Sequence, residues 1–243
     1  MQVKVVGCSN SWSTRPTSCY CVDDTILVDC GAGVRKHFRK AKVFASNIKN
    51  IFVTHLHADH MVDLCEFINT ELTFKSQEKR KTLTIYGPVG LYNVLDFFVK
   101  TIALGGELGQ TIALKEYVNI IEIEDFETPI KISKYTITPY KLWHGYIDDI
   151  GYVFDDGSKK IGFSGDCILD ENALKFIEDI DGGFVDCYHK KTNRTHIGLD
   201  DFLKIKKQYP NKKLFAVHCD DEIYKIAKRY KVKVAKASKR YKF

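Results

Sequence analysis

The sequence predicts a mixed α/β fold, because short apolar runs of strand length alternate with longer segments whose apolar residues recur at helical spacing. The strands come in meandering groups with helices between them, a pattern typical of sheets covered by helices. An apolar fraction of 44% in 243 residues suffices for a large core. No internal repeat or linker-like stretch marks a boundary, so we expect a single domain over residues 1–243.

In the first half of the chain the pattern favours strands over short apolar runs, at residues 2–7, 18–22, 25–29, 48–54 and 81–86. Helices are expected at residues 34–41 and 59–76, and from Pro88 towards Leu104. Apolar residues such as Met61, Leu64 and Ile68 share one face of the second helix, and proline suits the first turn of the third.

The second half carries the same two signals in a different order. Strands are expected at residues 118–123, 130–133, 135–143, 150–154, 160–163, 182–187, 214–217 and 232–235. The run Asp155-Asp156-Gly157-Ser158 indicates a hairpin turn. Helices are expected at residues 171–178, 200–208 and 220–230.

The positive charge of the chain is local. Nine basic and no acidic residues lie between Tyr224 and Phe243, whereas the other 223 residues carry 28 basic and 31 acidic ones. The simplest interpretation of the tail is a helix and an edge strand with a solvated lysine face, with an auxiliary electrostatic role left open. A nucleic-acid-binding protein built on this tail is a rival hypothesis, but it leaves the histidine motif described next unexplained.

Cysteine usage and the N-terminus both predict a cytoplasmic protein. The eight cysteines are scattered without a C-x-x-C pair, and several lie in apolar strand-like runs, as expected of reduced, buried thiols. Residues 1–7 read as a strand and lack the apolar region of a signal peptide. There is no run of 18 apolar residues, so no membrane helix is expected.

One short segment carries the strongest chemical signal. Residues 54–60 read Thr-His-Leu-His-Ala-Asp-His, directly after an apolar strand and before a helix. Imidazole and carboxylate are ligands of zinc and its first-row neighbours. Four such groups are too many for one catalytic ion that keeps a position for water, so the segment predicts two ions.

Three later residues repeat the same context. His144, Asp166 and His218 each follow an apolar strand, as the first motif does. A single histidine after a strand is more often structural, but three recurrences together with the first motif favour a shared metal site.

These residues resemble the metallo-β-lactamase superfamily, through His-x-His-x-Asp-His, His144, Ser164-Gly165-Asp166 and the late His218. The resemblance implies a four-layer αβ/βα sandwich with a two-metal site at one edge. It implies that His55, His57 and His144 bind one ion, that Asp59, His60 and His218 bind the second, and that Asp166 bridges both. The ions would be divalent, with zinc expected first and manganese as an alternative. Asp59 would orient or deprotonate the attacking water.

Finer features are similar to the ribonuclease Z branch of that superfamily. These are Gly151-Tyr152 after His144, and the segment Thr195-His196-Ile197-Gly198, whose histidine would donate a proton to the leaving oxygen. Alternatively, His196 is a surface residue beside a helix capped by Thr195 or Asp200.

The substrate expected from this resemblance is a small phosphodiester, most simply a 3′,5′-cyclic mononucleotide. Ribonuclease Z carries a long arm that grips tRNA between the third histidine and the bridging aspartate, but only 21 residues separate His144 from Asp166. The chain thus looks like the arm-less cyclic-nucleotide phosphodiesterases, including phage and bacterial enzymes that degrade cyclic-nucleotide immune signals. Processing of tRNA 3′ ends is the first alternative, and a thioesterase or lactamase of the same fold is the second.

Substrate contacts and assembly are less constrained by the sequence. Trp12 could stack on a base and Arg15 could contact phosphate, although both also fit a surface loop. His189 is a further candidate for substrate binding, while a supporting role in the site and a structural role stay open. The helix-rich insert at residues 88–111 could be a dimer or lid element, and by analogy with the family we expect a homodimer.

Overall fold

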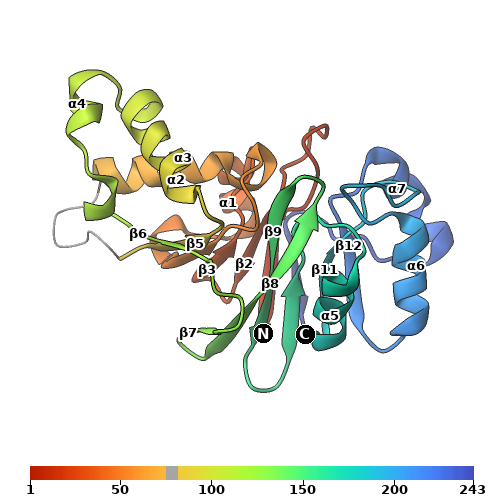
Figure 1. The fold of residues 1–243 in the computed structure, drawn as a ribbon. Helices are drawn as coiled ribbons and strands as arrows, with labels where there is room; N and C mark the ends of the chain where they lie inside the picture. The colour runs from red at the N-terminus through yellow and green to blue at the C-terminus, as the bar shows by residue number, and fades with distance from the viewer. Residues whose placement is uncertain (75–81) are drawn as a thin grey trace.

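The computed structural model describes residues 1–74 and 82–243, except the side chains of residues 70–74 and 108. Two sheets face each other in the middle of the molecule (Figure 1). The first has the order β13-β1-β2-β3-β4-β5-β6 and the second β12-β11-β10-β9-β8-β7. The strands of the first sheet are β1 (Gln2–Gly7), β2 (Cys19–Val22), β3 (Ile26–Val28), β4 (Asn50–Phe52), β5 (Thr84–Gly87), β6 (Asn119–Glu122) and β13 (Lys239–Lys242). Those of the second are β7 (Ile130–Ile132), β8 (Tyr135–His144), β9 (Ile147–Asp155), β10 (Lys160–Phe163), β11 (Gly182–Asp186) and β12 (Lys213–Val217).

Helices cover the outer face of each sheet, which makes four layers (Figure 1). On the first sheet lie α1 (Val34–Ala41), α2 (Ala58–Phe74) and α3 (Leu91–Phe97), and beyond α3 comes α4 (Gly106–Thr111). On the second lie α5 (Glu171–Asp179), α6 (Leu199–Gln208) and α7 (Asp221–Ile226). Each helix presents apolar residues to its sheet, such as Phe38 of α1 and Phe202 of α6. The four-layer αβ/βα arrangement expected from the sequence is confirmed.

Parallel pairing brings several strand ends to one edge of the sandwich. Strands β3, β4, β5 and β6 are parallel to one another, and so are β10, β11 and β12. Because parallel strands end on the same side, residues that follow them gather at one edge. An aromatic core between the sheets holds the two halves together, and it includes Phe52, Phe154, Phe163 and Phe184.

Two predicted elements differ from the structure. The helix expected from Pro88 to Leu104 is interrupted, since α3 passes into a π-helical turn at Phe98–Ala103 and the chain then bends at Gly105 and Gly106, both with positive φ. The end of the helix expected at residues 59–76 and the start of the strand expected at 81–86 lie outside the described residues.

The C-terminal segment also differs from its prediction. The strand expected at residues 232–235 is reduced to a single bridge between Val234 and Ala216, because its buried residues Val232 and Ala235 are three apart and not two. The strand that does form is β13, which pairs with β1 and packs Tyr241 against Phe215 at a ring distance of 4.6 Å. The helix expected at residues 220–230 is α7 followed by a 3₁₀ turn at Ala227–Tyr230.

No helix among residues 1–74 and 82–243 is long and apolar enough to cross a membrane. All eight cysteines are buried and unpaired, as the sequence predicted.

The aromatic core predicts a large penalty for its truncation. Phe184 is 1% exposed, and its ring lies 4.9 Å from that of Tyr20 and 5.5 Å from that of Phe163. Phe184→Ala should lower the free energy of unfolding by about 3–5 kcal/mol, as measured by urea denaturation. The same substitution at Phe44, which is 65% exposed, should change it by less than about 0.5 kcal/mol. Equal effects at the two positions would contradict the described core.

Candidate metal centre

Strand ends supply the side chains of this site. The motif at residues 54–60 follows β4, and Asp166 and His218 follow β10 and β12, while His144 ends β8. All of these strands stop at the same edge of the sandwich, so residues far apart in the sequence meet there. The structure brings together all seven residues expected as metal ligands, in two adjoining groups.

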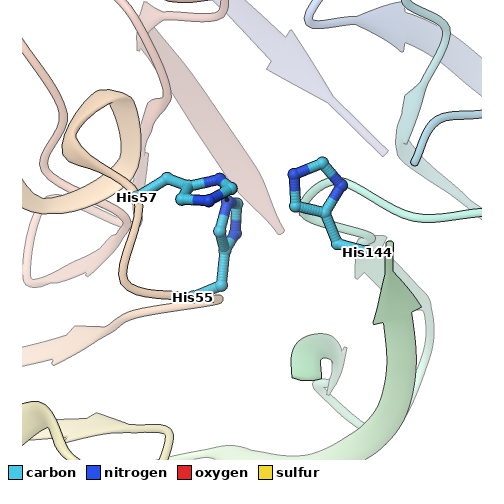
Figure 2. A group of neighbouring side chains, drawn as sticks. All are labelled: His55, His57 and His144. Atoms are coloured by element: carbon cyan, nitrogen blue, oxygen red, sulfur yellow. Dashed lines mark hydrogen bonds between the residues drawn. The ribbon is translucent and has the colours of Figure 1, made fainter. Parts of the chain in front are cut away.

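The first group consists of His55, His57 and His144, whose candidate donor atoms lie within 4.8 Å of one another. Figure 2 shows the three imidazole rings meeting, two from the loop after β4 and one from the end of β8. The Nε2 atom of His55 lies 3.1 Å from Nδ1 of His57. His55 and His144 are buried and His57 is exposed, so this group opens to solvent on one side.

The second group consists of Asp59, His60, Asp166 and His218, all buried. His218 Nε2 lies 3.0 Å from Asp59 Oδ2 and 3.3 Å from Asp166 Oδ2. His60 Nε2 lies 3.3 Å from Asp166 Oδ1. The donor atoms of this group also lie within 4.8 Å of one another.

Asp166 stands between the two groups. Besides its contacts in the second group, its Oδ2 atom lies 3.9 Å from His55 Nε2 and 4.0 Å from His144 Nε2. Burial acts to raise the pKa of Asp166, but the neighbouring His218, His60 and His55 outweigh it and hold the pKa well below its usual range. Asp166 is therefore a carboxylate, with both oxygens available to cations.

The donor atoms fit divalent cations. His60 Nε2 and Asp166 Oδ1 are buried and face each other at 3.3 Å, but neither forms a hydrogen bond among the described residues, which is costly for a buried polar atom. Three of the imidazoles are held through Nδ1: His55 by Asp149 at 2.8 Å, His60 by Asp29 at 2.8 Å and His144 by the Thr195 carbonyl at 2.7 Å. Such outer contacts orient histidine ligands in metal sites.

Sequence reasoning missed three buried aspartates that position histidines of the site. Asp29 follows β3 and Asp186 ends β11, so the signal of an apolar strand followed by a metal-type side chain, applied to every strand, would have found both. Asp149 lies inside β9, where the only signal is a carboxylate beside the apolar run at residues 150–154.

His196 is buried beside the second group. Its Nδ1 atom lies 3.0 Å from Asp186 Oδ2, an oxygen that also accepts the backbone N–H groups of Cys167 and Ile197. Burial acts to lower the pKa of His196, but the charge and hydrogen bond of Asp186 outweigh it and raise the pKa. His196 is 8% exposed, so the alternative of a surface residue is wrong.

Asp186 and His196 also come within 4.8 Å of Asp166 and His218, so these four residues form a third possible ligand group. Asp186 Oδ2 already accepts hydrogen bonds from His196 and two backbone N–H groups, but Asp186 Oδ1 and His218 Nδ1 are buried without a hydrogen bond among the described residues, as His60 Nε2 is in the second group. Both groups share Asp166 and His218; the second adds Asp59 and His60, and the third adds Asp186 and His196.

The residues expected to contact substrate lie in the loops around the centre. Trp12 is 89% exposed. Arg15 donates to Ser9, Ser13 and Asp221, and its guanidinium covers the Tyr224 ring at 3.9 Å. His189 is exposed and pairs with Asp220 at 2.7 Å. These contacts leave Trp12 with the freest side chain of the three.

Known proteins share this fold. The metallo-β-lactamase fold protein YhfI from Bacillus subtilis superposes with a TM-score of 0.77 at 20% identity, covering 99% of this chain and 98% of that one. The short form of human tRNase Z gives 0.75 at 21% identity, covering 100% and 99%. These likenesses confirm the metallo-β-lactamase fold.

Sequence comparison identifies the branch. Ribonuclease Z from Borrelia duttonii (strain Ly) is 34% identical over 137 residues, which are 56% of this chain and 40% of the relative, so the chain matches less than half of that protein. A family model described as Anti-Pycsar protein Apyc1 matches residues 9–241, nearly the whole chain. The resemblance to a metal-dependent hydrolase branch close to ribonuclease Z is thereby confirmed, and the chain belongs to the Anti-Pycsar protein Apyc1 family.

Proposed function

We propose that the protein is a two-metal phosphodiesterase whose substrate is a 3′,5′-cyclic mononucleotide. The observation that carries the proposal is the position of Asp166 between two groups of candidate ligands. Family membership and the ribonuclease Z relatives support phosphodiester chemistry.

In this proposal each group holds one ion. His55, His57 and His144 would hold the first, Asp59, His60 and His218 would hold the second, and Asp166 would serve both. This mixture of imidazole and carboxylate suits zinc, with manganese as the alternative. When bound, the two ions would supply an acidified water and stabilise the attacking and leaving oxygens of the displacement.

Asp59 then orients the attacking water. Burial acts to raise its pKa, but the hydrogen bond from His218 and the charges of His60 and His218 outweigh it, so the pKa lies below its usual range. An ionised Asp59 accepts a hydrogen bond from water near neutral pH. Its low pKa favours the orienting role over storage of the transferred proton.

His196 acts as the general acid. Its Nδ1–H donates to Asp186, so Nε2 is the nitrogen that gives up a proton. Because Asp186 raises the pKa of His196, more of the imidazole is protonated at neutral pH than in free histidine. That proton would pass to the alkoxide oxygen that leaves when the cyclic ester opens.

A small substrate fits the surroundings of the centre. A cavity of about 460 Å³ beside Asp59 is lined by hydroxyl and basic side chains, among them Ser11, Thr14, Arg15 and Lys36. The 21 residues between His144 and Asp166 are occupied by β9 and β10 and their turns, which leaves no arm for a large RNA there. Both features favour a nucleotide over tRNA.

Processing of tRNA 3′ ends is the second candidate function, because the curated relatives are named ribonuclease Z. It would require the RNA to be gripped outside the segment that carries the arm in those enzymes.

For assembly and location we propose a cytoplasmic homodimer. The insert between β5 and β6 exposes large apolar side chains, with Phe97 at 61% and Ile102 at 63% exposure, which a second copy would cover. The eight buried, unpaired thiols suit a reducing compartment.

The substrate proposal predicts the outcome of a panel assay. The metal-loaded protein should hydrolyse at least one 3′,5′-cyclic mononucleotide when offered these beside 2′,3′-cyclic nucleotides and a pre-tRNA, with products read by chromatography and gel. Asp166→Ala should abolish the reaction and reduce bound metal, measured by mass spectrometry of the elements, below two ions per chain. Asp170→Ala removes only the N-cap of α5 and should keep activity and metal. Cleavage of pre-tRNA alone would establish the second candidate instead.

The general-acid role predicts a dependence on the leaving group. His196→Ala should slow hydrolysis of the cyclic nucleotide about 100-fold or more, since an alkoxide needs a proton to leave. It should slow hydrolysis of bis-p-nitrophenyl phosphate less than about tenfold, because nitrophenolate leaves without one. Steady-state kcat on the two substrates tests this, and equal losses on both would remove His196 from the acid role.

The pair of Asp186 and His196 predicts a pH effect. Asp186→Asn removes the charge that raises the pKa of His196, so that pKa should fall, as followed by NMR of the imidazole. A general acid must be protonated, so the high-pH limb of the rate profile should move to lower pH. Asp220→Asn, at the exposed pair with His189, should move neither. An unchanged limb in Asp186→Asn would show that another group supplies the proton.

A further inference from the structure

The basic C-terminal segment lines a groove that is separate from the metal centre. The groove has a volume of about 690 Å³ and lies between the turns after α7, the loop at residues 231–236 and β13. Five lysines line it: Lys225, Lys228, Lys231, Lys233 and Lys236. Phe215, Tyr224 and Tyr241 contribute aromatic rings to the same groove, which we call the lysine groove.

The lysine groove carries positive charge that the described residues do not neutralise. None of its five lysines forms an ion pair with any carboxylate of residues 1–74 and 82–243. The carboxylates at the start of α7 form ion pairs with other residues, since Asp221 binds Arg15 and Glu222 binds Lys190. From Lys225 to the C-terminal residue the sequence contains no acid.

Neighbouring elements add further positive charge. Lys206 of α6 donates to the Lys231 carbonyl at 2.8 Å, and Lys213 of β12 donates to the Lys242 carbonyl. Partial burial, together with the charge of Lys233, lowers the pKa of Lys206. Like charges are thus crowded around a concave surface, an arrangement that an anionic ligand would relieve.

Hydrogen bonds hold the groove in shape. Tyr224 donates its hydroxyl to the Ala235 carbonyl at 2.9 Å, and the Lys236 backbone N–H donates to the Tyr241 hydroxyl at 2.9 Å. The backbone N–H of Ala216 in β12 donates to the Lys233 carbonyl, and the Ala216 carbonyl accepts from the backbone N–H of Ala235. The lysine side chains therefore project from a fixed backbone and not from a loose tail.

We propose that the lysine groove is a second, non-catalytic binding site for the phosphate backbone of single-stranded nucleic acid. Several separated charges match a chain of phosphates better than a single phosphate ion. Lysine ammonium groups act as point charges on phosphates without reading sequence. A membrane would require a flat or convex face, whereas these lysines surround a hollow. The proposal is independent of the reaction at the metal centre.

Binding of a fluorescein-labelled oligothymidylate to the metal-loaded protein, measured by anisotropy over a series of salt concentrations, tests the site. Each lysine that neutralises a phosphate on a single strand adds about 0.7 to the slope of log affinity against log salt. Replacement of Lys225, Lys228, Lys231 and Lys233 by glutamine should flatten that slope by up to about 3 and weaken binding at low salt about tenfold or more. Gel analysis verifies that the probe stays intact.

The control removes the same number of charges elsewhere. Lys40, Lys49, Lys131 and Lys175 are exposed and lie on other elements, so their replacement by glutamine gives a protein of equal net charge. This variant should bind the oligonucleotide with at least half the original affinity, and thermal unfolding verifies that both variants are folded. Equal losses in the two variants would overturn the proposal, as would binding to phosphatidylserine vesicles with none to the oligonucleotide.

Discussion

The rest of the structure depends on the burial of many carboxylates and imidazoles at one edge of the sandwich. Five buried aspartates meet there with five buried histidines, namely Asp29, Asp59, Asp149, Asp166 and Asp186 with His55, His60, His144, His196 and His218. Charges removed from water without partners cost several kcal/mol each. The arrangement is tolerable because each carboxylate faces an imidazole, and two divalent cations would offset the remaining negative charge. An edge built from apolar side chains would need neither this pairing of charges nor the cations.

His55 and His60 each lie between a supporting aspartate on one side and Asp166 on the other, and this fixes the orientation of their rings. Asp29 and Asp149 hold the outer nitrogens of His60 and His55, so the inner nitrogens face Asp166. The supporting aspartates come from β9 and the end of β3, which are anchored by the aromatic core. Rigid strands therefore set the positions of both the candidate ligands and the groups that orient them, and preorganised geometry of this kind lowers the cost of reaching the transition state.

Features encoded by neighbouring residues could be predicted from the sequence, whereas features that depend on contacts between distant residues could not. The motif at residues 54–60 is contiguous, and His144 and His218 repeat its context, so those positions were predictable. Asp149 was not, because its role depends on β9 passing beside His55, a contact between residues 94 positions apart in the chain. The interrupted helix after Pro88 and strand β13 were missed for similar reasons. The π-helical turn has no strong local signature, and the pairing of Lys239–Lys242 depends on β1 at the other end of the chain.

The separation of charge along β12 is a consequence of the same constraint. Phe215 of this strand lines the lysine groove, and three residues later His218 lies among the buried aspartates, a span of about 10 Å. Lysines placed among those aspartates would compete with divalent cations for the carboxylates, so a metal centre excludes them. The lysine groove and the candidate metal centre therefore keep opposite charges at two places along one strand, and each suits a ligand of the opposite sign.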